Sequence, residues 1–186
     1  MEALLVSIGV VALAEIGDKT QLLTLVLAAR YKKPWPIVAG IFVATLVNHG
    51  IAGAVGAWLT KTIGPDAMRW ILGVSFIAMA AWMLIPDKLD DDEAAARKVG
   101  GVFVTTTVLF FFVEIGDKTQ IATVALAARF DSLLAVVMGT TIGMILTNAP
   151  VAFFGDALAR RLPVRAIHLV AAGVFAALGV GVLLFG

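Results

Sequence analysis

The chain has 186 residues, of which 61% are hydrophobic and 15% are charged, and its formal net charge is +1. This composition is typical of a protein that spans a lipid bilayer and excludes an ordinary soluble domain. With no cysteine in the chain, any bound metal must be held by oxygen atoms or by the two histidines. The near-neutral charge gives no sign of a nucleic-acid partner, and we expect none.

Six apolar stretches are long enough to cross a membrane as helices. In chain order they cover residues 3–29, 36–59, 67–85, 101–128, 133–159 and 164–185. The first stretch does not have the pattern of a cleavable signal peptide, because it begins Met1-Glu2 without positive charge and is far too long. We therefore expect an all-α membrane protein with six transmembrane helices.

The first and fourth stretches share one sequence, Glu-Ile-Gly-Asp-Lys-Thr, at residues 15–20 and 114–119. The identity continues to residues 30 and 129 except at the pairs Leu22/Ile121, Leu23/Ala122, Leu25/Val124 and Val26/Ala125. Further along the chain, Gly40 matches Gly139 and Asn48 matches Asn148. The chain is therefore a tandem duplication, with a first three-helix repeat at 1–86, a linker at 87–100 and a second three-helix repeat at 101–186.

An odd number of spans in each repeat means that the second repeat enters the membrane from the opposite face. Inverted repeats of this kind are a common transporter architecture, with the binding site near the midplane. Lysine and arginine are enriched in cytoplasmic loops, so their distribution predicts a cytoplasmic linker and both termini outside. One side carries Arg30, Lys32, Lys33, Lys88, Arg97, Lys98, Arg160, Arg161 and Arg165, and the other carries Lys61, Arg69 and Arg129.

The repeated motif places charged side chains deep in the expected membrane. At about 1.5 Å per residue, Glu15 lies roughly 18 Å into its span, and Glu114 is equivalent to it. A charge at that depth costs roughly 3 kcal/mol or more, so it normally faces a cavity, a partner or a transported ion. Within each repeat the glutamate and the aspartate are three residues apart and share one helix face. Two such helices would gather four carboxylates at one point: Glu15, Asp18, Glu114 and Asp117.

Neighbouring polar residues extend this candidate ion site. All offer the hard oxygen atoms that suit Ca²⁺, Mn²⁺ or Mg²⁺, although hydroxyls and amides in spans also bond between helices. These candidates are Gln21, Gln120, Thr20, Thr119, Asn48 and Asn148. Gly17 and Gly116 either unwind the helix beside the ion or let helices pack closely. His49 could bind the ion or relay protons, but its counterpart is Ala149, which favours a structural role.

Counting the charges of the motif indicates exchange of a cation for protons. Four carboxylates together with Lys19 and Lys118, which we expect to balance their charge, leave a net charge of minus two. One divalent cation or two protons would neutralise it. A carboxylate cluster in a low-dielectric site takes up protons when it loses its cation, so the two would compete for one site.

The chain resembles the Mn²⁺/Ca²⁺:proton exchangers of the Golgi, of chloroplasts and of bacteria. Their signature is Glu-x-Gly-Asp-(Lys/Arg)-(Thr/Ser), once in each three-helix half, and both copies in this chain match it at every position. The resemblance implies a cation/proton antiporter in which Glu15, Asp18, Glu114 and Asp117 bind the ion. It further implies manganese export across a bacterial plasma membrane, with no enzyme activity and no cofactor besides the transported ions.

Two other classes of function are compatible with parts of the pattern. An intramembrane aspartyl protease also uses Gly-Asp in a span and two carboxylates that share a proton, but it would give the glutamates and lysines no role. A passive cation channel, or an exporter of small organic cations, would not need proton coupling. Manganese and calcium both fit, because both accept sites made only of oxygen atoms.

Overall fold

The computed structural model describes residues 1–85, 100–155 and 163–185, and it contains helices but no strand within these ranges. The helices are α1 (Glu2–Glu15), α2 (Lys19–Tyr31), α3 (Pro34–Thr62), α4 (Pro65–Trp82), α6 (Val102–Glu114), α7 (Lys118–Arg129), α8 (Leu133–Phe154) and α10 (Val164–Phe185). The expected linker lies outside the described residues except for Gly100, as do residues 156–159 of the expected fifth span.

Three helices, α3, α8 and α10, are long and apolar enough to cross a membrane, and α6 is a shorter apolar helix. The protein is therefore an all-α membrane protein. The stretches expected to be the first and fourth spans are not continuous helices in the structure. Each is divided into two helices, α1 with α2 and α6 with α7, by a short break after the motif glutamate.

Glycine makes each of these breaks possible. Gly17 has a φ of 83° and Gly116 a φ of 78°, in a region that residues with a side chain rarely adopt. The backbone N–H of Gly17 donates to Oε1 of Gln21 at 3.0 Å, and that of Gly116 donates to Oε1 of Gln120 at 2.7 Å. Of the two interpretations of these glycines, the structure thus supports unwinding of the helix beside the motif carboxylates.

The two repeats pack on each other through equivalent pairs of helices. Helix α1 lies against α8, and α6 lies against α3, so each half-helix contacts the long helix of the other repeat. Glycines allow this approach: a Cβ on Gly139 would lie 2.8 Å from Cβ of Ser7, and one on Gly40 would lie 2.7 Å from Cβ of Thr106. Small residues at such contacts let helix backbones approach closely in membranes. The two matched glycines of the duplication therefore hold equivalent interfaces.

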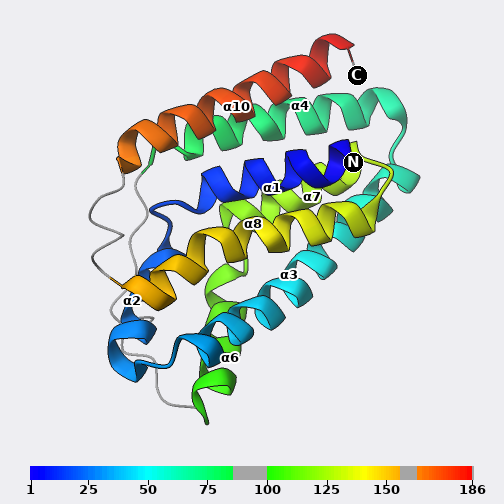
Figure 1. Cartoon of the computed structure of the whole chain (residues 1–186). Coiled ribbons are helices and arrows are strands. Elements are labelled where there is room, and N and C mark those ends of the chain that lie inside the picture. Colours follow the sequence, from blue (N-terminus) through cyan, green and yellow to red (C-terminus); the bar gives the residue numbers. More distant parts are fainter. Residues whose placement is uncertain (86–99, 156–162, 186) are drawn as a thin grey trace.

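Helices α4 and α10 form a pair at one edge of the molecule (Figure 1). The pair contacts the rest of the protein mainly through α10 on α1 and α4 on α7. Among the described residues it has no extensive contact with α2 or α6, although these are the equivalents of α7 and α1. The α4–α10 pair therefore breaks the symmetry that the other helices follow.

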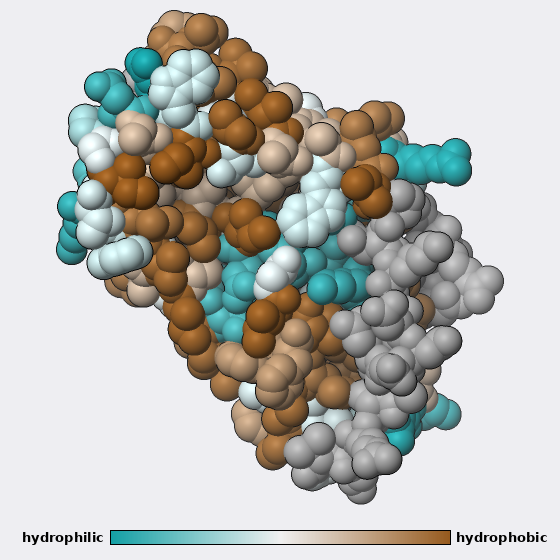
Figure 2. All heavy atoms as spheres, turned by 180° about the vertical axis from the view of Figure 1, so that it is seen from behind, coloured by the Kyte–Doolittle hydropathy of each residue, from teal (hydrophilic) through white to brown (hydrophobic). Residues whose placement is uncertain are grey.

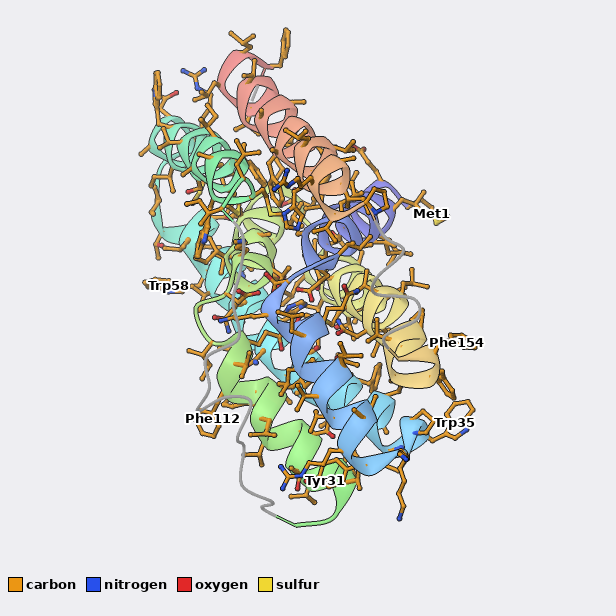
Figure 3. All side chains as sticks on the ribbon, turned by 90° about the vertical axis from the view of Figure 1, so that its left-hand side faces the viewer. Met1, Tyr31, Trp35, Trp58, Phe112 and Phe154 are labelled. Atoms are coloured by element: carbon orange, nitrogen blue, oxygen red, sulfur yellow. The ribbon has the colours of Figure 1, made fainter. Side chains whose placement is uncertain are left out.

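Apolar side chains cover much of the outside, and many polar side chains are enclosed. Trp58, Phe112 and Phe154 point away from the bundle (Figure 3) and are 61%, 66% and 72% exposed. The face seen from behind has a hydrophilic centre with hydrophobic side chains above and below it (Figure 2). An apolar exterior around a polar centre is the arrangement expected when the surroundings are lipid.

Candidate ion-binding site

Three carboxylates from both repeats meet inside the bundle. Glu15, Asp18 and Asp117 each offer an oxygen atom, and these atoms all lie within 4.8 Å of one another. All three residues are buried. We call them the three-carboxylate cluster. Carboxylate oxygens at this spacing could be drawn together around one hard divalent cation, which takes oxygen ligands at about 2.0–2.6 Å.

Helix ends at the two breaks position these residues. Glu15 and Glu114 are the last residues of α1 and α6, whereas Asp18 and Asp117 are the N-caps of α2 and α7. The N-terminal end of a helix favours negative charge, and the C-terminal end leaves carbonyl oxygens without helical partners. Broken helices that direct such ends at the membrane midplane are a known way to bind ions.

The two motif lysines lie in different surroundings. Nζ of Lys19 is 3.6 Å from Oδ1 of Asp117, so the lysine of one repeat pairs with the aspartate of the other. Lys118 is buried; its Nζ donates to the carbonyl of Ile85 at 3.3 Å and lies 5.9 Å from the centre of the Trp82 ring. Lys19 thus reduces the repulsion within the three-carboxylate cluster directly. Lys118 thus contacts Trp82, the last residue of α4, and Ile85 just beyond that helix.

Glu15 is held on one oxygen only. Its Oε2 accepts hydrogen bonds from the hydroxyl of Thr20 at 2.5 Å and from Nδ2 of Asn148 at 3.4 Å. Its Oε1 is buried and accepts no hydrogen bond of good geometry from the described residues. A buried carboxylate oxygen normally has a partner, so a cation or a proton at Oε1 would complete the site.

Glu114 lies outside the three-carboxylate cluster. The amide of Asn48 donates to its Oε2 at 3.2 Å, and the hydroxyl of Thr45 lies 3.5 Å from the same oxygen. Nε2 of His49 is 2.9 Å from Oε1 of Glu114, with both side chains fully buried. The structure therefore does not gather four carboxylates at one point. Sequence reasoning missed Thr45, although Thr45, Asn48 and His49 follow the spacing of one helix face.

The remaining sequence-predicted residues support the breaks and the aspartates. Besides the glycine contact described above, Nε2 of Gln21 donates to the carbonyl of Thr147 at 3.3 Å. The hydroxyl of Thr119 donates to Oδ2 of Asp117 at 3.3 Å. The hydrogen bonds of both glutamines and of Thr119 described here are thus made to other residues of the protein next to the site.

His168 is a second residue that the sequence did not mark as part of this region. Its Nε2 lies 2.7 Å from the carbonyl oxygen of Ile16, directly beside the first break. Val164, one turn earlier on α10, packs against Gly17. At the second break nothing lies within 4 Å of a Cβ placed on Gly116. Helix α10 therefore covers the first break, whereas no described residue packs on the glycine of the second break.

Buried carboxylates at the meeting point of broken apolar helices are typical of a membrane protein that transports ions. Comparison with known proteins identifies the particular family. The model of the family "Divalent cation/proton antiporter GDT1" matches residues 3–91 and 102–186. The chain belongs to this family.

A curated relative is similar over most of both chains. It is 50% identical over 176 residues, which are 94% of this chain and 87% of the relative, and it is named "Putative manganese exporter" from Vibrio cholerae serotype O1. No solved structure matches the chain. Since the family is one of transporters, these comparisons favour transport over the intramembrane protease.

Proposed function

We propose that this divalent cation/proton antiporter exports Mn²⁺ from the cytoplasm and binds it at Glu15, Asp18 and Asp117. The observation that carries the proposal is the approach of these three buried carboxylates, contributed by both repeats, to within 4.8 Å of one another. The name of the Vibrio cholerae relative favours manganese as the cation. Oxygen ligands of this kind suit Mn²⁺ and Ca²⁺ alike.

Charge balance at the cluster supplies the coupling. Three carboxylates and the ammonium group of Lys19, which pairs with Asp117, sum formally to minus two. One divalent cation neutralises this charge, and so do two protons. A carboxylate cluster in a low-dielectric site is costly when it is left uncompensated, so release of the cation favours uptake of protons. The protons would then cross the membrane in the direction opposite to that of the cation.

We further propose that the two repeats are inverted and cross the membrane six times, with both termini outside. The matched contacts of α1 with α8 and of α6 with α3 support this arrangement. The excess of lysine and arginine in the loops expected on the cytoplasmic side supports its direction. A bacterial plasma membrane fits the source of the relative.

Transport into proteoliposomes under an imposed pH gradient tests the function. With an acidic lumen, protons leave the vesicle, and we expect them to drive uptake of Mn²⁺; a protonophore should slow this uptake. Parallel measurements with Ca²⁺ and Mg²⁺ determine the preferred cation. A flux that follows the membrane potential but ignores the pH gradient would contradict antiport and favour a channel.

Neutral variants test the three-carboxylate cluster. Glu15→Gln and Asp117→Asn each keep the shape of the side chain and remove one negative ligand, so we expect both to abolish Mn²⁺ transport while folded protein remains in the membrane. Glu2→Gln is the matched control, because Glu2 is exposed at the start of α1. Wild-type transport by Asp117→Asn would show that the cluster does not bind the transported ion.

A further inference from the structure

The two motif glutamates occupy equivalent positions in the sequence but have different surroundings. Glu114 is surrounded by three side chains of one face of α3: Thr45, Asn48 and His49. Glu15 receives the equivalent contact from α8 only through Asn148. The counterparts of Thr45 and His49 on α8 are Ile145 and Ala149, which offer no side-chain donor. The difference between the two glutamates therefore arises from the different sequences of α3 and α8.

His49 makes the closest recorded contact to Glu114. Its Nε2 lies 2.9 Å from Oε1 of Glu114, and neither side chain is exposed. Oε1 of neither glutamate accepts a hydrogen bond of good geometry from the described residues, but only Oε1 of Glu114 has a histidine nitrogen in ion-pair contact with it. The two glutamates thus differ in the close contact of His49, which only Glu114 has among the described residues.

We propose that His49 is a positioning residue that holds Glu114 away from the three-carboxylate cluster and so sets how tightly the cation is bound. This inference rests on the proposed function of that cluster. With Glu114 held by α3, three carboxylates and Lys19 leave two formal negative charges, which match one divalent cation. A fourth carboxylate would add a further negative charge. The cation would then be bound more tightly and released more slowly.

The proposal predicts opposite effects on affinity and rate. His49→Leu removes the imidazole nitrogen that contacts Glu114 and puts an apolar side chain of similar size in its place, so Glu114 becomes able to join the cluster. Loss of one close polar contact to a buried carboxylate corresponds to roughly tenfold in an equilibrium. We therefore expect the KM for Mn²⁺ transport to fall by about tenfold, together with a similar fall in maximal rate. A merely structural role would lower the amount of active protein without lowering KM.

Two further variants keep the test decisive if His49→Leu does not fold. His49→Gln retains an amide N–H near the position of Nε2, so it should restore KM and maximal rate to within about threefold of wild type. Ala149→His places an imidazole at the position of α8 equivalent to His49, next to Asn148, which contacts Glu15. It should draw Glu15 away from the cluster and raise KM by about tenfold.

Binding of Mn²⁺ alone to the detergent-solubilised full chain, followed by calorimetry, gives a second readout. We expect tighter binding in His49→Leu and weaker binding in Ala149→His. Unchanged affinity and rate in both, or weaker binding in His49→Leu, would overturn the inference while leaving the proposed function intact. Failure of the proposed function would look different. In that case the wild-type protein would not transport Mn²⁺, or Asp117→Asn would transport it as well as the wild type does.

Discussion

At the scale of single residues, the glycine in each motif decides the local backbone. Gly17 and Gly116 adopt nearly the same positive φ, and each donates its N–H to a glutamine four residues later. The difference between them lies in their neighbours. Val164 and His168 of α10 lie close to Gly17, whereas no described residue lies within 4 Å of a Cβ placed on Gly116. Gly17 and Gly116 thus form a matched pair, in which the effect of neighbouring side chains can be measured separately from backbone strain.

Replacement of these glycines by alanine should therefore have unequal effects. Gly116→Ala adds only the strain of a side chain at positive φ, about 1–2 kcal/mol. Gly17→Ala adds the same strain and also a collision with Val164 that α10 must move to relieve. We therefore expect Gly17→Ala to have the lower melting temperature of the two variants. The difference should be about 2–4 °C for each kcal/mol of unfolding free energy that the collision costs. Thermal unfolding of both variants in detergent measures this difference. Equal shifts in melting temperature would mean that α10 does not pack tightly on the first break.

At the scale of helices, the fold depends on how closely the half-helices approach the long helices. Gly139 of α8 faces the backbone of α1, and Gly40 of α3 faces that of α6. This closeness brings Asn148 to Glu15 and Asn48 to Glu114, across the boundary between the repeats. The packing of α1 on α8 and of α6 on α3 therefore also determines the polar partners of the site.

A methyl group in this interface should destabilise the protein. In Gly139→Ala the new Cβ would lie 2.7 Å from the carbonyl oxygen of Leu4, and overpacking of this kind costs about 1–3 kcal/mol. Gly173→Ala in α10 is the control, because nothing lies within 4 Å of its added Cβ. Alanine is favoured over glycine inside a helix by up to about 1 kcal/mol, so the control should unfold at the same or a higher temperature. A stabilised Gly139→Ala would contradict the close contact of α1 with α8.

At the scale of the whole molecule, the two repeats differ most in the position of the α4–α10 pair. The pair contacts α1 and α7, and among the described residues it makes few contacts with α2 and α6. As a result α10 covers the first break, and within the described ranges no residue covers the second, although their local sequences are the same. Such a difference between equivalent halves is what an alternating-access transporter requires in any one of its states.

The inverted arrangement makes a prediction about equivalent loops. Lys33 and Ser132 are the N-caps of α3 and α8 and are both exposed. If the repeats are inverted, these two matched positions lie on opposite faces of the membrane. Because the chain has no cysteine, Lys33→Cys and Ser132→Cys can each be labelled singly in intact cells. An impermeant maleimide should label only Ser132→Cys, and labelling of both variants would show repeats of the same orientation.

The sequence by itself determined the class of the protein and the candidate residues of its ion-binding site. Composition indicated a membrane protein, and the duplication showed which residues are equivalent. The cost of charge in lipid indicated the four carboxylates as candidate ion-binding residues. These conclusions needed only local patterns, since hydropathy, repetition and residue type are all read along the chain.

Only the tertiary structure decided which of the four carboxylates meet and what surrounds each of them. Glu15 and Glu114 have the same neighbours in sequence, but their partners come from the long helix of the other repeat: Asn148 in one case, and Thr45, Asn48 and His49 in the other. The covering of a single break by α10 likewise arises from packing between distant segments. Contacts between residues so far apart depend on how the helices pack, and the local motif, being identical in both repeats, cannot distinguish them.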